Sequence, residues 1–188
     1  MIGKMFKTVL ATTLLAMPLH ANAQTAIGVS AVEETGTTFL ANALLKARHA
    51  AAVSGLSALA DDSGIEVDAL GGRPGVWSAR YAGPHANDAD NLALLLRELA
   101  SVPDPQRGAR YRCALVYVRH AADPDPVIAT GVWEGRVLAA PRGRGGFGYD
   151  PVFEPEGFAV TAAQMPAAQK NALSHRAQAL RALLAALP

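Results

Sequence analysis

The 188-residue sequence has one cysteine, few aromatic residues (6%) and a charged fraction of only 18%. A single cysteine, Cys113, excludes an intrachain disulfide, and its apolar neighbours predict a buried, inert thiol. The formal net charge of +1 gives no electrostatic reason to expect a nucleic-acid or membrane partner. CxxC, HExxH and Walker patterns, internal repeats and low-complexity tracts are also missing from the sequence.

Hydrophobic residues make up 51% of the chain, which is ample for one domain or for two small lobes around one core. Lysine is rare beside arginine, and the lysines are Lys4, Lys7, Lys46 and Lys170. A lone lysine deep in the C-terminal part, Lys170, is therefore a candidate functional residue.

The first 23 residues have two interpretations. Two lysines in residues 1–7, an apolar run over 8–19 and small residues at 21–23 form the pattern of a secretory signal. The apolar run is too short to span a bilayer. In the alternative interpretation, residues 6–12 are the first buried strand of the domain. The main domain then covers residues 24–188 in either case.

Hydrophobic periodicity predicts alternating helices and strands after this segment. Apolar residues at helical spacing predict helices over about 38–53, 87–100 and 167–187. Strands are predicted over 56–61, 65–67, 110–120 and 127–133, the last two as a hairpin. Glycine-rich loops are predicted over 70–83 and 142–151.

Two adjacent carboxylates, Asp61 and Asp62, stand where the first predicted strand ends. Because side chains alternate along a strand, the two should point to opposite faces. Ser63 and Gly64 predict a sharp turn directly after them. A carboxylate at a strand end suits a hard cation or an activated water, although this segment taken alone is more often only a turn.

Polar residues also gather at two predicted helix starts. Lys170, Ser174, His175 and Arg176 crowd the beginning of the last helix, an arrangement that suits an anion and also occurs in ordinary solvated first turns. Glu34 precedes the first helix, where an acidic residue commonly complements the helix dipole.

Four short segments, taken together and in order, give the chain a specific resemblance. They are Ala60-Asp61-Asp62-Ser63-Gly64, Gly75-Val76-Trp77-Ser78-Ala79-Arg80-Tyr81, Gly146-Phe147-Gly148-Tyr149-Asp150-Pro151 and Ser174-His175-Arg176. With them, residues 24–187 resemble the inosine/xanthosine triphosphate pyrophosphatase family, hydrolases of non-standard purine nucleotides. The resemblance implies an α/β fold with an elongated mixed central sheet, flanking helices and two lobes with a cleft between them. It also implies a cytoplasmic homodimer with no nucleic-acid or membrane partner.

The same resemblance implies a reaction and the residues that perform it. The reaction is Mg²⁺-dependent cleavage of ITP, dITP and XTP between the α- and β-phosphates, giving a monophosphate and pyrophosphate. Asp62 is implied as general base and metal ligand, with Glu34 as its acidic partner at the metal. Substrate contacts are implied at Thr12, Ser63, Phe147, Gly148, Tyr149, Asp150, Lys170, His175 and Arg176. Phe147 can stack on the base, and donors such as Arg176 would pair with a 6-oxo group and be left unpaired against adenine.

The N-terminal segment departs from the family pattern, in which the first strand leads into a Thr/Ser-x-Asn-x-x-Lys loop that holds the triphosphate. Thr12 matches the hydroxyl position, but Leu14 and Met17 stand where asparagine and lysine are expected. The helix that should follow is mostly missing. Loss of one charge-assisted phosphate contact costs about 1.5–3 kcal/mol, or roughly one to two decades in affinity or rate.

Three hypotheses accommodate this departure. The protein is an active pyrophosphatase with a weakened phosphate site, in which Arg144 or Lys7 replaces the missing lysine. Alternatively, it is a nucleotide-binding protein with little turnover. In the third hypothesis it is an exported hydrolase, and residues 1–23 are its signal peptide.

Overall fold

The computed structural model describes residues 29–187, and the strands in that range form a four-stranded sheet in the order β1-β2-β3-β4. The strands are β1 (Ala58–Val67), β2 (Gly108–Val118), β3 (Val127–Val137) and β4 (Phe153–Pro155). The helices are α3 (Phe39–Ser54), α4 (Asp88–Glu98), α5 (Ala167–Leu173) and α6 (His175–Ala186), and short 3₁₀ helices occupy Asp68–Leu70, Gly75–Arg80 and Asp104–Gln106. β3 and β4 pair antiparallel, with Arg136 opposite Glu154. The predicted α/β fold, with helices flanking a sheet, is confirmed.

Helices α3 and α4 begin at Phe39 and Asp88, one residue after the predicted starts, which are the capping residues. The Thr38 hydroxyl caps α3 by accepting a hydrogen bond from the Ala41 N–H at 3.1 Å. Gly55, with φ of 69°, ends the same helix in the left-handed conformation that glycine adopts without strain. Asn87 and Asp90 form a reciprocal capping box at the start of α4. Local sequence therefore determines both ends of α3 and the start of α4.

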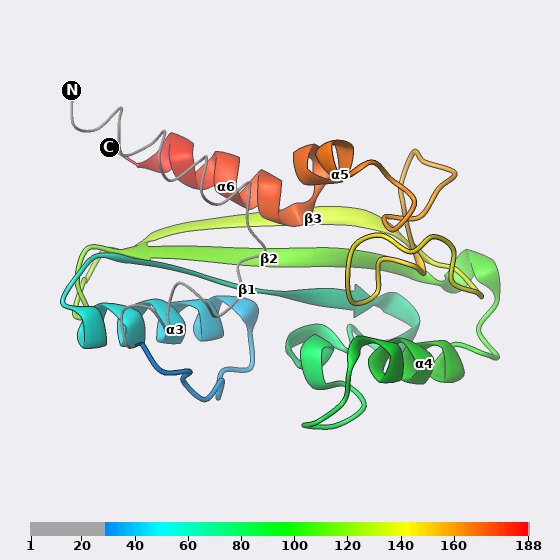
Figure 1. Cartoon of the computed structure of the whole chain (residues 1–188), viewed down its shortest axis with the longest axis horizontal. Coiled ribbons are helices and arrows are strands. Elements are labelled where there is room, and N and C mark those ends of the chain that lie inside the picture. The colour runs from blue at the N-terminus through cyan, green and yellow to red at the C-terminus, as the bar shows by residue number, and fades with distance from the viewer. Residues whose placement is uncertain (1–28, 188) are drawn as a thin grey trace. The chain divides into compact units, whose positions relative to one another are not determined.

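The chain divides into two compact units, and β1, β2 and β3 contribute residues to both. The described part of unit 1 comprises residues 29–62, 114–131 and 176–187. Within this unit, α3 and α6 cover opposite faces of the strands (Figure 1). Small residues on α3, Ala43, Ala47 and Ala51, are at most 3% exposed, so the helix packs closely on the sheet.

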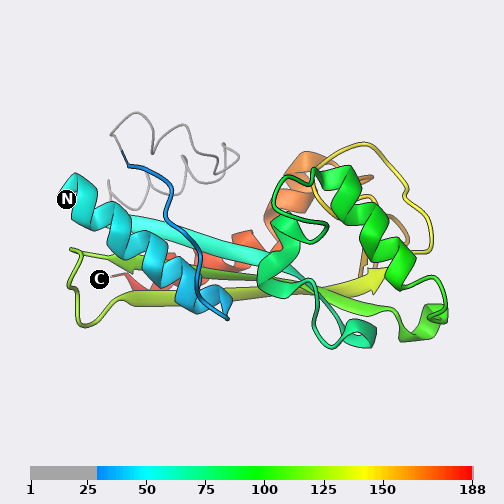
Figure 2. The same ribbon diagram turned by 90° about the horizontal axis from the view of Figure 1, so that it is seen from below.

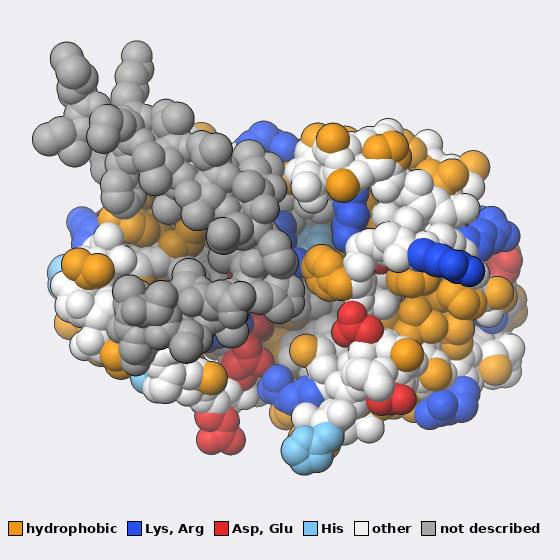
Figure 3. All heavy atoms as spheres, viewed as in Figure 1, with side chains coloured by type: hydrophobic (Ala, Val, Ile, Leu, Met, Phe, Trp, Pro, Cys, Tyr) orange, Lys and Arg blue, Asp and Glu red, His pale blue; other side chains and the backbone are white. Residues whose placement is uncertain are grey.

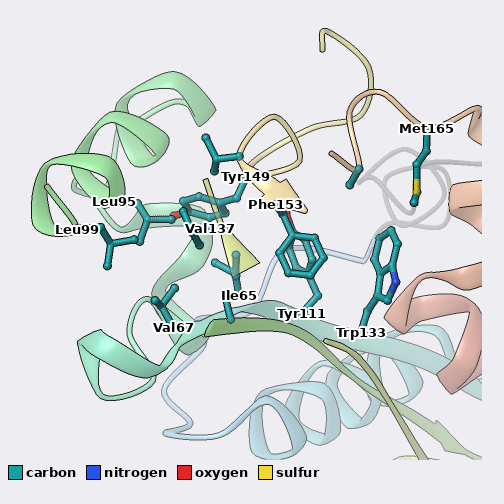
Figure 4. Close-up of a cluster of buried hydrophobic side chains, with 13 residues drawn as sticks. Ile65, Val67, Leu95, Leu99, Tyr111, Trp133, Val137, Tyr149, Phe153 and Met165 are labelled. Carbon is teal, nitrogen blue, oxygen red and sulfur yellow. The ribbon is translucent and has the colours of Figure 1, made fainter. Parts of the chain in front are cut away.

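Unit 2 comprises residues 63–113 and 132–175. Seen from below, α4 crosses in front of the strands of this unit, and α5 lies behind them (Figure 2). Its core joins apolar residues of β1 and α4 to a group of aromatic rings (Figure 4). Tyr111 and Trp133 both meet the ring of Phe153 edge-on, at centroid distances of 4.7 and 5.5 Å. Tyr149 of the 142–151 loop is part of this core, so the core holds that loop in place.

Strand β1 runs without interruption through Asp61, Asp62, Ser63 and Gly64, so the predicted turn at this point is wrong. Gly64 is instead a site of close approach within unit 2. A Cβ atom on it would lie 2.4 Å from Ser78 Oγ and 2.5 Å from the Gly75 carbonyl oxygen. A glycine inside a strand often marks such an approach of a second backbone, which sequence cannot distinguish from a turn.

The predicted helix over 167–187 is also wrong, because the segment forms two helices. Ser174 separates α5 from α6 with an extended conformation (φ −60°, ψ 158°). Serine is a preferred residue immediately before a helix, so a second start at this position is consistent with its chemistry. Lys170 therefore lies in the last turn of α5, whereas His175 and Arg176 begin α6.

Several predictions concern residues outside the described range. The strand over 6–12, the substrate contact Thr12 and the departures Leu14 and Met17 all lie there. Across residues 29–187, no helix combines the length and apolar character needed to cross a bilayer.

Candidate active site

Two carboxylates of unit 1 converge on one lysine. The Lys46 ammonium donates hydrogen bonds to Asp62 Oδ1 at 2.8 Å and to Glu34 Oε1 at 3.0 Å. The second oxygen of Asp62 accepts a hydrogen bond from the Asn42 amide at 3.2 Å. Asp62 is only 8% exposed, so this small cluster supplies partners for a carboxylate that is largely removed from water.

Helix α3 and the segment before it position this cluster. Asn42 and Lys46 are four residues apart on α3, so they lie on the same face of the helix. Asn42 is fully buried, and its Oδ1 accepts a hydrogen bond from the Gly36 N–H at 2.8 Å. Asn42 thus connects Asp62 to the segment that carries Glu34.

Burial and charge act in opposite directions on the cluster. Burial is the main cause that raises the pKa of Asp62, and the negative charge of Glu34 adds to it, while Lys46 and Asn42 oppose the rise. Burial works to lower the pKa of Lys46, but the hydrogen bonds and charges of its two acidic partners raise that pKa above its ordinary value. A carboxyl with a raised pKa is a better base near neutral pH than an ordinary aspartate.

The donor set fits a hard divalent cation. Oxygens of Glu34 and Asp62 already lie within 3.0 Å of a single positively charged atom, which shows that both can face one cation. Residues 29–187 contain no cluster of three or more metal-binding side chains. A cation here would therefore complete its coordination with water and substrate oxygens, as Mg²⁺ commonly does.

Asp61 contacts a different helix from its neighbour. Arg176, in the first turn of α6, donates from Nε to Asp61 Oδ2 at 3.0 Å. Because α3 and α6 cover opposite faces of the unit 1 strands, the two aspartates point to opposite faces, as predicted.

In unit 2, the loop over 147–150 presents an aromatic ring beside a cation. The Phe147 side chain is 50% exposed, and Lys170 Nζ lies 4.6 Å from its ring centroid. Lys170 also donates to Asp150, which is 2% exposed and accepts the Phe147 N–H at 2.8 Å. Figure 3 shows hydrophobic side chains exposed among acidic and basic ones on the face of this unit.

Two further hydrogen bonds hold the same loop. The Gly148 N–H donates to Asp88 Oδ2 at 2.7 Å, and the Tyr149 hydroxyl donates to the Ser78 carbonyl at 2.8 Å. Tyr149 is 4% exposed, and its burial raises the pKa of the phenol. The buried Tyr149 side chain thus anchors the loop to the core of unit 2, while the Phe147 ring remains accessible to solvent.

His175 is 5% exposed and stacks on Tyr111 with a centroid distance of 4.8 Å and an interplanar angle of 9°. The Tyr111 hydroxyl donates to Asp150 at 3.4 Å. Tyr111 thus contacts two predicted substrate contacts, Asp150 in the loop and His175 at the start of α6.

The structure brings some of the predicted site residues together within each unit and leaves Arg176 apart from Glu34 and Asp62, on the opposite face of the unit 1 strands. Glu34 and Asp62 meet in unit 1, where Arg176 contacts Asp61; Phe147, Asp150 and Lys170 meet in unit 2. Ser63 follows Asp62 directly in β1. Sequence reasoning missed Lys46 as a member of the site and Asp88 as a support of the loop. The available signal for Lys46 as a site residue was its spacing of four residues from Asn42, which places both on one face of the helix that follows Glu34.

The chain is similar to known proteins over most of its length. The model of the Ham1 family matches residues 4–186. A dITP/XTP pyrophosphatase from Shigella flexneri is 55% identical over 178 residues, covering 95% of this chain and 90% of that protein. One from Yersinia pestis is 53% identical with the same coverage. Among solved structures, a HAM1 protein from Coxiella burnetii matches with a TM-score of 0.82 and 48% identity, covering 86% of this chain and 82% of that one.

Proposed function

The chain belongs to the Ham1 family, and from this premise we propose that it hydrolyses non-standard purine nucleoside triphosphates to the monophosphate and pyrophosphate. The substrates are ITP, dITP and XTP. The observation that carries the proposal is the identity of 53–55% to dITP/XTP pyrophosphatases over 95% of the chain. The carboxylate cluster of unit 1 supports it, because that cluster has the chemistry needed for triphosphate hydrolysis.

Asp62 is the proposed general base, and Asp62 with Glu34 would hold the cation, Mg²⁺. When bound, Mg²⁺ offsets the charge of a triphosphate and lowers the pKa of a bound water. Asp62 would accept a proton from the attacking water, and its burial supports this role by raising the pKa of the carboxyl. Lys46 keeps a positive charge beside the two carboxylates and so limits the rise in the pKa of Asp62.

The residues of unit 2 are the proposed contacts for the base and its sugar-phosphate. The exposed ring of Phe147 is the stacking surface, with Gly148, Tyr149 and Asp150 forming the rest of the loop and Lys170 adding positive charge. Further substrate contacts are proposed at Thr12, Ser63, His175 and Arg176. Arg176 would donate to the 6-oxo group, which adenine lacks.

We further propose a cytoplasmic homodimer, and a domain over residues 24–188 preceded by a degenerate first strand and loop over 1–23. The family match, which begins at residue 4, supports a degenerate first strand and loop in this segment over a signal peptide. With Leu14 and Met17 in place of the expected asparagine and lysine, the phosphate site is weaker, and Arg144 or Lys7 is the proposed replacement. The alternatives are a nucleotide-binding protein with little turnover and an exported form that begins at Gln24.

The test is pyrophosphate release from ITP, XTP, dITP, ATP and GTP with Mg²⁺, using the full-length protein. Asp62→Asn is compared with Asp104→Asn, a control at a side chain that is 62% exposed. We expect selective turnover of ITP, dITP and XTP and a loss of about 10²–10⁴-fold in Asp62→Asn alone, because a general base contributes that much. A folded wild type that binds ITP without releasing pyrophosphate would instead establish the nucleotide-binding alternative.

A further inference from the structure

The loop over 147–150 is fixed at each of its first three residues by a different partner within unit 2. The Phe147 N–H donates to Asp150, the Gly148 N–H to Asp88 and the Tyr149 hydroxyl to the Ser78 carbonyl. Asp150 belongs to the loop itself. Asp88 is a charged side chain from another element, α4, and its bond to Gly148 is the shortest of the three at 2.7 Å.

The contact is specific to one of the two acids in the first turn of α4. Asp88 and Asp90 both lie in that turn, where either carboxylate complements the helix dipole. Asp90 is engaged in the capping box, accepting the Asn87 N–H at 3.1 Å. Asp88 alone reaches across 60 positions of sequence to the loop. Helix capping therefore does not account for Asp88.

The bond to Asp88 is made at a residue with an unusual backbone conformation. Gly148 has φ of +59°, a left-handed conformation in which L side chains are strained. A carboxylate that accepts the N–H of this glycine forms a charge-assisted hydrogen bond, roughly twice as strong as a neutral one. The bond holds the backbone directly after Phe147 while leaving the Phe147 ring 50% exposed.

We propose that Asp88 is a positioning residue that holds the Phe147 loop in the conformation that receives the purine base. This inference rests on the proposed function of that loop. Asp88 itself does not contact the substrate. Removal of the Asp88 carboxylate leaves the phosphate-binding and catalytic groups in place. Binding of the base must then order the loop, which costs free energy and raises KM. The effect therefore appears only for a ligand that carries a base.

The experiment compares Asp88→Ala, Asp88→Asn and Asp90→Ala with the wild type. In Asp88→Ala, we expect KM for ITP to rise about tenfold, the change expected for loss of one hydrogen bond to a charged group, with kcat within about twofold. Inhibition by inorganic tripolyphosphate, which has no base, should be unchanged. Asp88→Asn retains a neutral acceptor oxygen and should recover roughly half of the effect, so that KM for ITP rises about threefold. Asp90→Ala should lower thermal stability without raising KM.

Hydrogen exchange of residues 146–150, measured without nucleotide, separates this inference from the proposed function. Faster exchange in Asp88→Ala, but not in Asp90→Ala, would show that Asp88 holds the loop even in a protein with no turnover. The inference is overturned if hydrogen exchange and KM are unchanged in Asp88→Ala. It is overturned as well if Asp88→Ala weakens the binding of tripolyphosphate and of ITP by the same factor. It is also overturned if Asp90→Ala raises KM as much as Asp88→Ala, because the electrostatics of the helix end would then be the cause.

Discussion

The ammonium group of Lys46 lies 2.8 Å from Oδ1 of Asp62, in a cluster where Asp62 is 8% exposed. The buried carboxylate thus has its own counter-ion before any cation or substrate arrives. Breaking such a pair leaves an uncompensated charge away from water, which changes the protonation of the remaining partner.

Replacing Lys46 with methionine should raise the pKa of Asp62 in the metal-free protein above its wild-type value. Lys46 is the strongest influence that lowers this pKa, and its removal leaves only the Asn42 hydrogen bond to oppose burial and the charge of Glu34. A ¹³C NMR titration of the aspartate carboxyls measures the change. Lys46→Arg, which retains the charge, should stay closer to wild type. An Asp62 pKa in Lys46→Met at or below the wild-type value would contradict the role of this pair.

Stability at high pH should depend on the same lysine. The folded pKa of Lys46 is raised above 10.5, so the folded state holds the proton more tightly than the unfolded chain. The resulting stabilisation is fully present below pH 10.5 and is lost as pH rises through the folded pKa. Urea unfolding at about pH 9 and about pH 11.5 should therefore show a larger loss in wild type than in Lys46→Met. Equal losses in the two proteins would refute this linkage.

Gly64→Ala should lower the free energy of unfolding by about 1–3 kcal/mol, the usual cost of overpacking. The new methyl group would meet Ser78 Oγ at 2.4 Å and the Gly75 carbonyl at 2.5 Å. Adding Ser78→Ala should recover little or none of the loss, because the Gly75 backbone remains in the way and the buried Ile65 N–H loses Ser78 Oγ, its acceptor at 3.0 Å. Chemical denaturation of the two variants measures both effects, and an unchanged midpoint for Gly64→Ala would show that the approach is looser than described.

Arg176→Gln should reduce the preference for ITP over ATP by about tenfold or more, since the proposed charged donor to the 6-oxo group is replaced by a shorter, uncharged amide. Arg176 also holds Asp61 at 3.0 Å, so Asp61→Asn serves as a control that weakens this contact and keeps the guanidinium. The ratio of kcat/KM for the two nucleotides is the measurement. Unchanged discrimination in Arg176→Gln would exclude Arg176 as the residue that reads the base.

Sequence predicts best where the determining interactions are local. Thr38 and Asn87 cap helices through bonds three residues away, and both helix starts were predicted. The sequence predicts a turn at Gly64, but a glycine is needed there because residues 75–78 approach it closely. No local sequence pattern reveals that approach. Residues of the candidate site were predicted from resemblance.

The supporting residues were missed for the same reason. Lys46 is 16 positions from Asp62, and Asp88 is 60 positions from Gly148. Only the folded chain brings such partners together, and a lysine or aspartate on a helix surface is by default solvated.

The uninterrupted course of β1 through Asp61 and Asp62 has a consequence for how the two acids are told apart. They are chemically identical neighbours, yet one contacts Lys46 on α3 and the other Arg176 on α6. Their roles are therefore assigned by the parity of their positions in the strand. Deleting one residue of β1 before Asp61 would shift the strand by one position. Asp61 would then point to the face that Asp62 now occupies, and Asp62 to the opposite face, although neither side chain has been altered.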